Sequence, residues 1–168
     1  MCDTGPIVAA ALVGDDHHHA CVELFTGMHL AGRPLLVPGT VVAEVGYLLA
    51  RESRARVEAL FLKALADGDF QLVDLTVEDL RRAAELVETH ADLPLGTTDA
   101  TVLALAERLG LREVATLDRR HFSVVRTSPA CRGVDASPEL IMVRLVPTGI
   151  PTLIPTITSD ATDRGCRF

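Results

Sequence analysis

The sequence predicts an α/β fold in which a short parallel sheet has helices on both faces. Short apolar strands alternate with helices along residues 1–126, and this alternation implies right-handed crossovers between parallel strands. The chain has 168 residues, 48% of them hydrophobic, so it can bury one core without disulfide or metal staples. Because sites in such sheets form beyond the carboxyl ends of the strands, residues at those ends are the candidates for a functional site.

Turn and capping residues mark the predicted elements of the first half. Pro6 lacks an N–H and suits the first turn of a helix, Gly32 is a helix stop, and Ser53 can cap a helix. The predicted elements are, in order, a strand stub Met1–Asp3, helices Pro6–Leu12 and Asp16–Leu30, a strand Leu35–Val37, a helix Thr40–Arg51 and a helix from Ser53 to Gly68.

Similar signals mark the second half. Thr76 to Asp79 has the pattern of a capping box, and Thr97 or Thr98 can cap a helix that Gly110 ends. The predicted elements are a strand Phe70–Leu75, a helix from Thr76 to about His90, a loop Asp92–Gly96, a helix reaching Arg108, and strands Val114–Thr116 and Ser123–Val125.

The composition changes near Thr127. Residues 1–128 contain 12 basic and 19 acidic side chains, whereas residues 129–168 contain four of each and five of the nine prolines. We therefore expect a domain of residues 1–126 and an extension of residues 127–168 that is irregular or partly disordered, with one short strand in Leu140–Val146.

Charge and cysteine content exclude several classes of protein. The net charge of −7 argues against a simple basic grip on nucleic acid. The four cysteines form no Cys-x-x-Cys pair and are too sparse for a disulfide scaffold. Asp3, rather than a basic residue, precedes the first apolar run, and no run reaches the length of a membrane span. We expect a cytoplasmic protein without membrane contact.

Four carboxylates occupy strand ends and helix starts. Asp3 follows the first strand stub, and Asp118 follows the strand that ends at Thr116. Asp99 lies in the first turn of its helix, and Glu44 stands in an apolar run where a Glu needs a partner. Converging like charges raise one another's pKa. A hard divalent cation such as Mg²⁺ or Mn²⁺ relieves this repulsion and can activate water.

Taken singly, most of these acids also fit ordinary structural roles. Asp99 by itself is a favourable helix N-terminal charge, Asp118 an ordinary turn residue, and Asp3 an exposed terminus. The run His17–His19 suggests a metal site, but adjacent helical residues point about 100° apart. We therefore predict that this run is a solvated helix start.

Four segments carry a resemblance to a known family: Asp3-Thr-Gly-Pro, Val42-Ala-Glu-Val-Gly-Tyr47, Gly96-Thr-Thr-Asp-Ala100 and Ala115-Thr-Leu-Asp-Arg-Arg-His-Phe122. In this order and spacing, over residues 1–126, the chain resembles the PIN-domain family and, within it, the VapC toxins of bacterial toxin–antitoxin pairs. The resemblance implies a PIN-like α/β/α sandwich with a short central parallel sheet. It also implies Mg²⁺- or Mn²⁺-dependent endoribonuclease activity on RNA, inhibition by a VapB partner, and a homodimer.

By motif position, the resemblance assigns catalysis and metal binding to four acids, Asp3, Glu44, Asp99 and Asp118. Asp3 and Asp99 would be the most direct ligands. The hydroxyls of Thr4 and Thr116 fall where the family has supporting polar groups. Arg119 and Arg120 can meet the RNA backbone, or they can equally be surface charges paired with nearby acids.

Two features depart from the family pattern. Only Met1 and Cys2 precede Asp3, and we expect so short a central strand to lose ladder hydrogen bonds and to hold Asp3 loosely. Residues 127–168 follow the point where relatives usually end. Two alternatives therefore stay open, a catalytically impaired PIN module that binds its antitoxin and a PIN nuclease outside a toxin pair.

Overall fold

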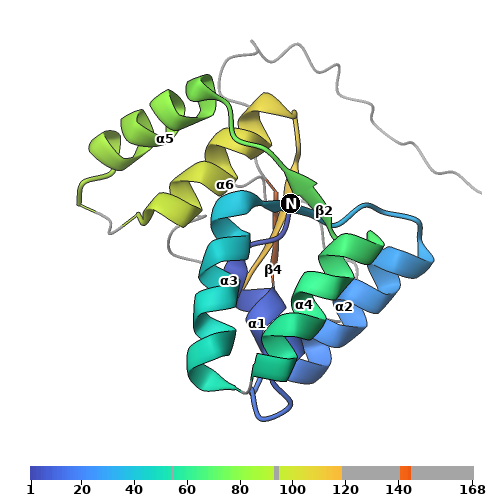
Figure 1. Cartoon of the computed structure of the whole chain (residues 1–168). Coiled ribbons are helices and arrows are strands. Elements are labelled where there is room, and N and C mark those ends of the chain that lie inside the picture. Colours follow the sequence, from blue (N-terminus) through green and yellow to red (C-terminus); the bar gives the residue numbers. More distant parts are fainter. Residues whose placement is uncertain (54, 93–94, 119–140, 145–168) are drawn as a thin grey trace, which may run out of the picture.

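The computed structural model describes residues 1–53, 55–92, 95–118 and 141–144, and Figure 1 shows how their helices and strands are arranged. The elements in these residues are, in chain order, α1 (Thr4–Ala11), α2 (His18–Leu30), β1 (Leu36–Pro38), α3 (Gly39–Glu52), α4 (Ala55–Asp67), β2 (Gln71–Val73), α5 (Val77–Thr89), α6 (Thr97–Arg108), β3 (Glu113–Thr116) and β4 (Ile141–Arg144).

A short sheet runs through the centre of the fold. β1 pairs in parallel with β2, with Leu36 opposite Gln71, and β3 pairs antiparallel with β4, with Glu113 opposite Arg144. The first residues of the chain lie between β1 and β3, where Cys2 forms a parallel bridge with Ala115. The predicted parallel sheet is confirmed, and the strand expected within residues 140–146 adds an antiparallel edge to it.

The stub Met1–Asp3 is held on both sides. The N–H of Cys2 donates to the carbonyl of Leu36 at 2.8 Å, and the N–H of Asp3 donates to the carbonyl of Ala115 at 3.0 Å. Ala115 returns a hydrogen bond to the carbonyl of Met1 at 2.9 Å. The expectation of a loosely held Asp3 is wrong, because the short stub keeps backbone hydrogen bonds to the strands on both of its sides.

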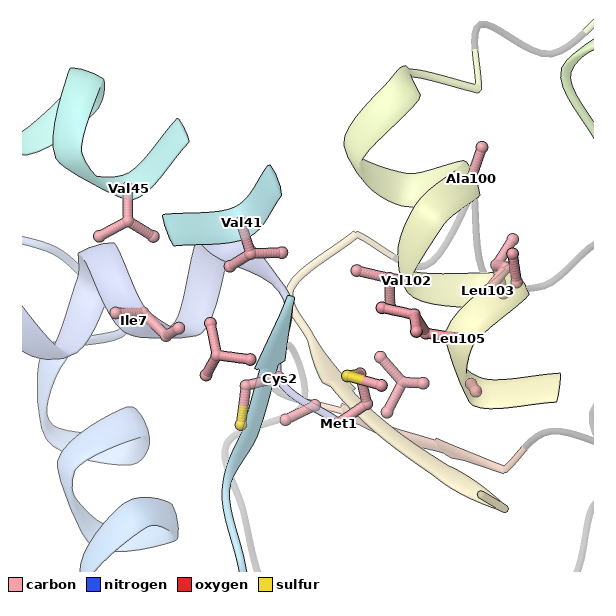
Figure 2. Packing of buried hydrophobic residues seen from close by; sticks show 14 of the residues in the cluster. Met1, Cys2, Ile7, Val41, Val45, Ala100, Val102, Leu103 and Leu105 are labelled. Atoms are coloured by element: carbon pink, nitrogen blue, oxygen red, sulfur yellow. The ribbon is translucent and has the colours of Figure 1, made fainter. Parts of the chain in front are cut away.

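Helices pack against both faces of this sheet, as predicted. Figure 2 shows Ile7 of α1 and Val45 of α3 on one side of β1, and Leu105 of α6 on the other side. α6 is buried nearly all round, because its residues 100–106 are at most 1% exposed. A helix that is apolar all round is typical of the interior of a layered fold, and the burial gives the first turn of α6 a rigid support.

The ends of several elements differ from the prediction by one or two residues, and α1 begins at Thr4 rather than Pro6. The second helix begins at His18 rather than Asp16, because the carboxylate of Asp15 accepts a hydrogen bond from the N–H of His17 at 2.8 Å and forms a turn there. β2 is confined to the three residues that pair with β1. The predicted strand Ser123–Val125 and the expected domain boundary after residue 126 lie outside the described residues.

The predicted capping box at the start of α5 is confirmed. The Thr76 hydroxyl accepts from the N–H of Asp79 at 3.2 Å, and the Asp79 carboxylate accepts from the N–H of Thr76 at 2.8 Å. Arg108 of α6 donates to the same carboxylate at 2.8 Å. This box therefore fixes α5 against α6 far along the chain from the acids Asp3 and Glu44.

We expect Thr76→Val to lower the free energy of unfolding by about 1 kcal/mol, because the helix loses its N-cap. Urea unfolding measures this change. Thr76→Ser keeps the hydroxyl and should match the parent. Equal stability of the valine variant and the parent would contradict the role given to the cap.

Candidate active site

Asp3 lies at the carboxyl end of the central strand and is only 6% exposed. One carboxylate oxygen accepts from the N–H of Thr4 at 2.7 Å, and the other accepts from the hydroxyl of Thr116 at 2.7 Å. Asp3 is also the N-cap of α1. Its carboxylate is therefore held in one orientation by the strand, the helix start and β3 together.

Glu44 reaches this carboxylate through Thr4. The Thr4 hydroxyl donates to Glu44 Oε2 at 2.6 Å, across a separation of 40 residues in sequence. Glu44 therefore has a hydrogen-bond partner, as the sequence argument expected. Its side chain is nevertheless exposed rather than buried, because α3 turns its apolar residues Val41 and Val45 to the core and Glu44 to the outside.

Asp99 lies in the first turn of α6, where the positive end of the helix dipole favours a carboxylate. The residue before that helix is Gly96, and a Cβ added there would lie 3.5 Å from Asp99 Oδ2. The carboxylate therefore folds back over the helix start. Because residues 100–106 are buried, the helix that carries Asp99 is packed firmly in the core.

The charges of Asp99 and Glu44 act on the carboxylate of Asp3. Burial raises the pKa of Asp3 from 3.8 to about 6, and the hydrogen bonds from Thr116 and Thr4 limit that rise. The negative charges of Asp99 and Glu44 raise the pKa of Asp3 further. Both carboxylates therefore lie close enough to Asp3 to destabilise its charged form, as expected for acids gathered at one site.

The fourth acid, Asp118, is joined to Thr116 by a backbone hydrogen bond. Asp118 lies two residues beyond β3, and its N–H donates to the Thr116 hydroxyl oxygen at 3.0 Å. Thr116 thus contacts both Asp3 and the segment that carries Asp118, and it is fully buried. Arg119 and Arg120, the basic residues assigned to RNA, lie outside the described residues.

The donor set at this edge suits a hard divalent cation. In the described part of the chain, no three His, Cys, Asp or Glu side chains enclose a metal ion by themselves. Mg²⁺ does not need such a cage, because it keeps several waters and binds through one or two carboxylates. The pKa of Asp3 is raised by burial and further by two like charges, and a bound cation would relieve both effects, so Asp3, Glu44 and Asp99 fit the implied ion.

Sequence reasoning missed two further threonines near these acids. Thr40 of α3 and Thr101 of α6 are joined through their hydroxyls at 2.7 Å. Thr101 is the one polar residue in the buried stretch 100–106 of α6. A buried hydroxyl needs a hydrogen-bond partner, so its place among apolar neighbours was the signal available in the sequence.

Other candidate features lie apart from the acids. The ring nitrogen Nδ1 of His18 is 3.1 Å from the carbonyl oxygen of Ala9, and His19 is exposed at the start of α2, as predicted for a helix start. A cavity of about 330 Å³ is lined by residues that precede β1 and β2, including Arg33 and Asp69. It therefore opens at the end of the parallel strands opposite to the acids.

None of the helices in the described ranges has the length and hydropathy needed to cross a membrane.

Comparisons with known proteins agree with this architecture. A family model for the PIN domain matches residues 1–127. The chain is 33% identical over 124 residues to Ribonuclease VapC26 of Mycobacterium tuberculosis, and this alignment covers 74% of this chain and 90% of that protein. The crystal structure of VapC20 from the same organism, a toxin that cleaves the sarcin–ricin loop, superposes with a TM-score of 0.66 at 18% identity, over 73% of this chain and 92% of that one.

The structural similarity establishes the fold. The matches to the family model and to Ribonuclease VapC26 establish the relationship in sequence. The buried Asp3 at the end of the central strand lies within the matched residues, as do Glu44, Asp99 and Asp118. The chain therefore belongs to the PIN-domain family.

Proposed function

We propose that this PIN domain is a Mg²⁺- or Mn²⁺-dependent endoribonuclease and the toxin of a VapBC-type toxin–antitoxin pair. The observation that carries the proposal is the buried Asp3, held by Thr116 and Thr4 and destabilised by the charges of Asp99 and Glu44. The similarity to Ribonuclease VapC26 supports RNA as the substrate, and the VapC relatives support a VapB-type antitoxin as partner.

In this proposal, Asp3 and Asp99 are the direct ligands of the ion, and Glu44 and Asp118 complete the site through water or a second ion. A bound divalent ion supplies an activated water and neutralises charge on the leaving oxygen. The acids are catalytic through this role. Glu44 lies on α3, Asp99 lies on α6 and Asp3 caps α1, so helices rather than loops set the spacing of these three acids.

Thr4 and Thr116 orient Asp3, the most buried of the proposed ligands. The Thr116 hydroxyl donates its only proton to Asp3 and accepts from the N–H of Asp118. The Thr4 hydroxyl donates to Glu44 while its N–H donates to Asp3. Each threonine therefore ties two acids together, which is the arrangement expected of groups that orient metal ligands.

The charge of the chain shapes how RNA would bind. Residues 1–128 carry 19 acidic and 12 basic side chains, so the domain offers RNA little positive potential of its own. We propose that binding depends strongly on the metal ion, with Arg119 and Arg120 as the contacts to the RNA backbone. A homodimer and a cytoplasmic location belong to the same proposal.

The catalytically impaired alternative loses its main support. It rested on a loosely held Asp3, and both sides of the Met1–Asp3 stub are hydrogen bonded. All four acids are present in the chain. A nuclease outside a toxin pair would share the same site, so the two are separated by whether a VapB-type protein forms a stable complex that stops cleavage.

Purified protein should cut RNA in the presence of Mg²⁺ or Mn²⁺. EDTA should stop the reaction, and excess Mn²⁺ should restore it. Gel electrophoresis of a labelled RNA mixture reports cleavage, and a matched DNA mixture tests whether the cleavage is specific to RNA. Cleavage that continues at full rate in EDTA would contradict the metal-dependent mechanism.

A further inference from the structure

We propose that Thr40 and Thr101 act as positioning residues for the metal site, because their hydroxyls join the helix that carries Glu44 to the helix that carries Asp99. The inference rests on the proposed metal-dependent function and extends it to two residues outside the set of proposed metal ligands. It concerns how the chain sets the distance between two of its ligands.

The hydrogen bonds form a directed chain between the two helices. The Thr101 hydroxyl donates to the carbonyl of Thr98 at 2.8 Å, which uses its only proton. The contact of 2.7 Å between the two hydroxyl oxygens must therefore be a donation from Thr40 to Thr101. The chain runs from the first turn of α3 into the first turn of α6.

Each end of this chain lies beside a candidate ligand. Thr40 precedes Glu44 by four residues, so the two lie on the same face of α3, one turn apart. Thr98 is the immediate neighbour of Asp99 in the first turn of α6. A change in the spacing of the two hydroxyls would therefore move both carboxylates relative to Asp3.

Apolar packing alone does not fix that spacing. Figure 2 shows Val41 and Val102, the chain neighbours of the two threonines, in the core beside the central strand. Contacts of this kind are non-directional, whereas a hydrogen bond fixes distance and angle. Thr101 is fully buried, so its lone pair has no water to replace Thr40. A site for Mg²⁺ needs ligands near 2.0–2.1 Å in octahedral geometry. Small shifts of the helices that carry the ligands therefore lower the affinity for the ion.

The test is Mn²⁺ binding by the metal-free full chain, measured by isothermal titration calorimetry. We expect Thr40→Val and Thr101→Val to raise the Kd for Mn²⁺ about 10-fold, which is the size of effect seen when groups that orient metal ligands are removed. Valine keeps the branched shape and replaces the hydroxyl with a methyl group. The double variant should resemble Thr101→Val, because both substitutions interrupt one chain of bonds.

Two controls separate positioning from general stability. Thr40→Ser and Thr101→Ser keep the hydroxyls and should bind Mn²⁺ within about twofold of the parent. Thr76→Val removes the cap of α5 and lowers the melting temperature, but it should leave the Kd for Mn²⁺ unchanged. If Thr101→Val does not fold, Thr40→Val still tests the proposal, because Thr40 is partly exposed.

The outcomes distinguish this inference from the proposed function. A parent that binds Mn²⁺ but cuts no RNA overturns the proposed function alone. Valine variants that bind Mn²⁺ as tightly as the parent overturn the positioning role alone. A loss of affinity in the valine variants that the serine variants do not share supports the positioning role.

Discussion

Asp3→Asn is expected to lower RNA cleavage by about 10³-fold, because loss of a direct ligand removes several kcal/mol of metal-dependent stabilisation and each 1.4 kcal/mol is a factor of ten in rate. Asparagine keeps the shape of the side chain and an oxygen that can accept from the N–H of Thr4. The fold should therefore survive. Single-turnover cleavage at saturating Mn²⁺ measures the loss.

The same substitution should stabilise the metal-free protein above pH 6. The pKa of Asp3 is raised from 3.8 to about 6, chiefly by burial, so between these values the folded state binds more protons than the unfolded state. Stability from this group is present below pH 4 and is lost as pH rises through 6. At pH 7.5 the ionised Asp3 lowers the free energy of unfolding by up to about 3 kcal/mol, and asparagine, which carries no charge, avoids this loss.

Asp79→Asn is the matched control for this result. Asp79 is the other buried aspartate in the described residues, at 2% exposed. Burial alone would raise its pKa, but the N–H of Thr76 and the guanidinium of Arg108 outweigh burial and hold the pKa of Asp79 below its usual value. Neutralising it should destabilise the protein at pH 7.5 and leave cleavage intact. If Asp3→Asn were also destabilising in EDTA, the charge argument for Asp3 would fail.

The order of the elements and the candidate acids were predictable because they depend on local signals. Pro6, Gly32 and the box at Thr76 each act within one turn of their own position, and the structure has a helix start, a helix end and a cap there. Asp3 and Asp99 stand in short motifs. Position in a motif identifies such residues without any knowledge of what packs around them.

The state of the site depends on contacts between distant segments. Asp3 is buried and anchored because β1 and β3 flank it, and those strands are about 35 and 110 residues away in sequence. The partner of Glu44 is Thr4, 40 residues earlier. Local periodicity contains no information on such pairs, which is why the sequence alone suggests a loose stub and does not identify Thr40 as the partner of Thr101.

Asp99→Asn is expected to lower cleavage by about 10²- to 10³-fold, since this acid is the second direct ligand in the proposed site. Its charge also raises the pKa of Asp3. With Mn²⁺ well below saturation, protons compete with the ion for Asp3, so the parent should lose activity as pH falls through about 6. In Asp99→Asn, the residual activity should lose its acid limb at a lower pH.

This shift in the pH profile distinguishes a shared site from two unrelated acids. Glu107→Gln is the matched control, because Glu107 lies near the other end of the same helix and pairs with Arg82 of α5 at 2.7 Å. It removes the same charge from α6 and should change neither the rate nor the acid limb. If Asp99→Asn cuts RNA as fast as the parent, the proposed metal site is wrong. A slow Asp99→Asn with an unmoved acid limb would instead place Asp99 in the reaction but outside the electrostatic reach of Asp3.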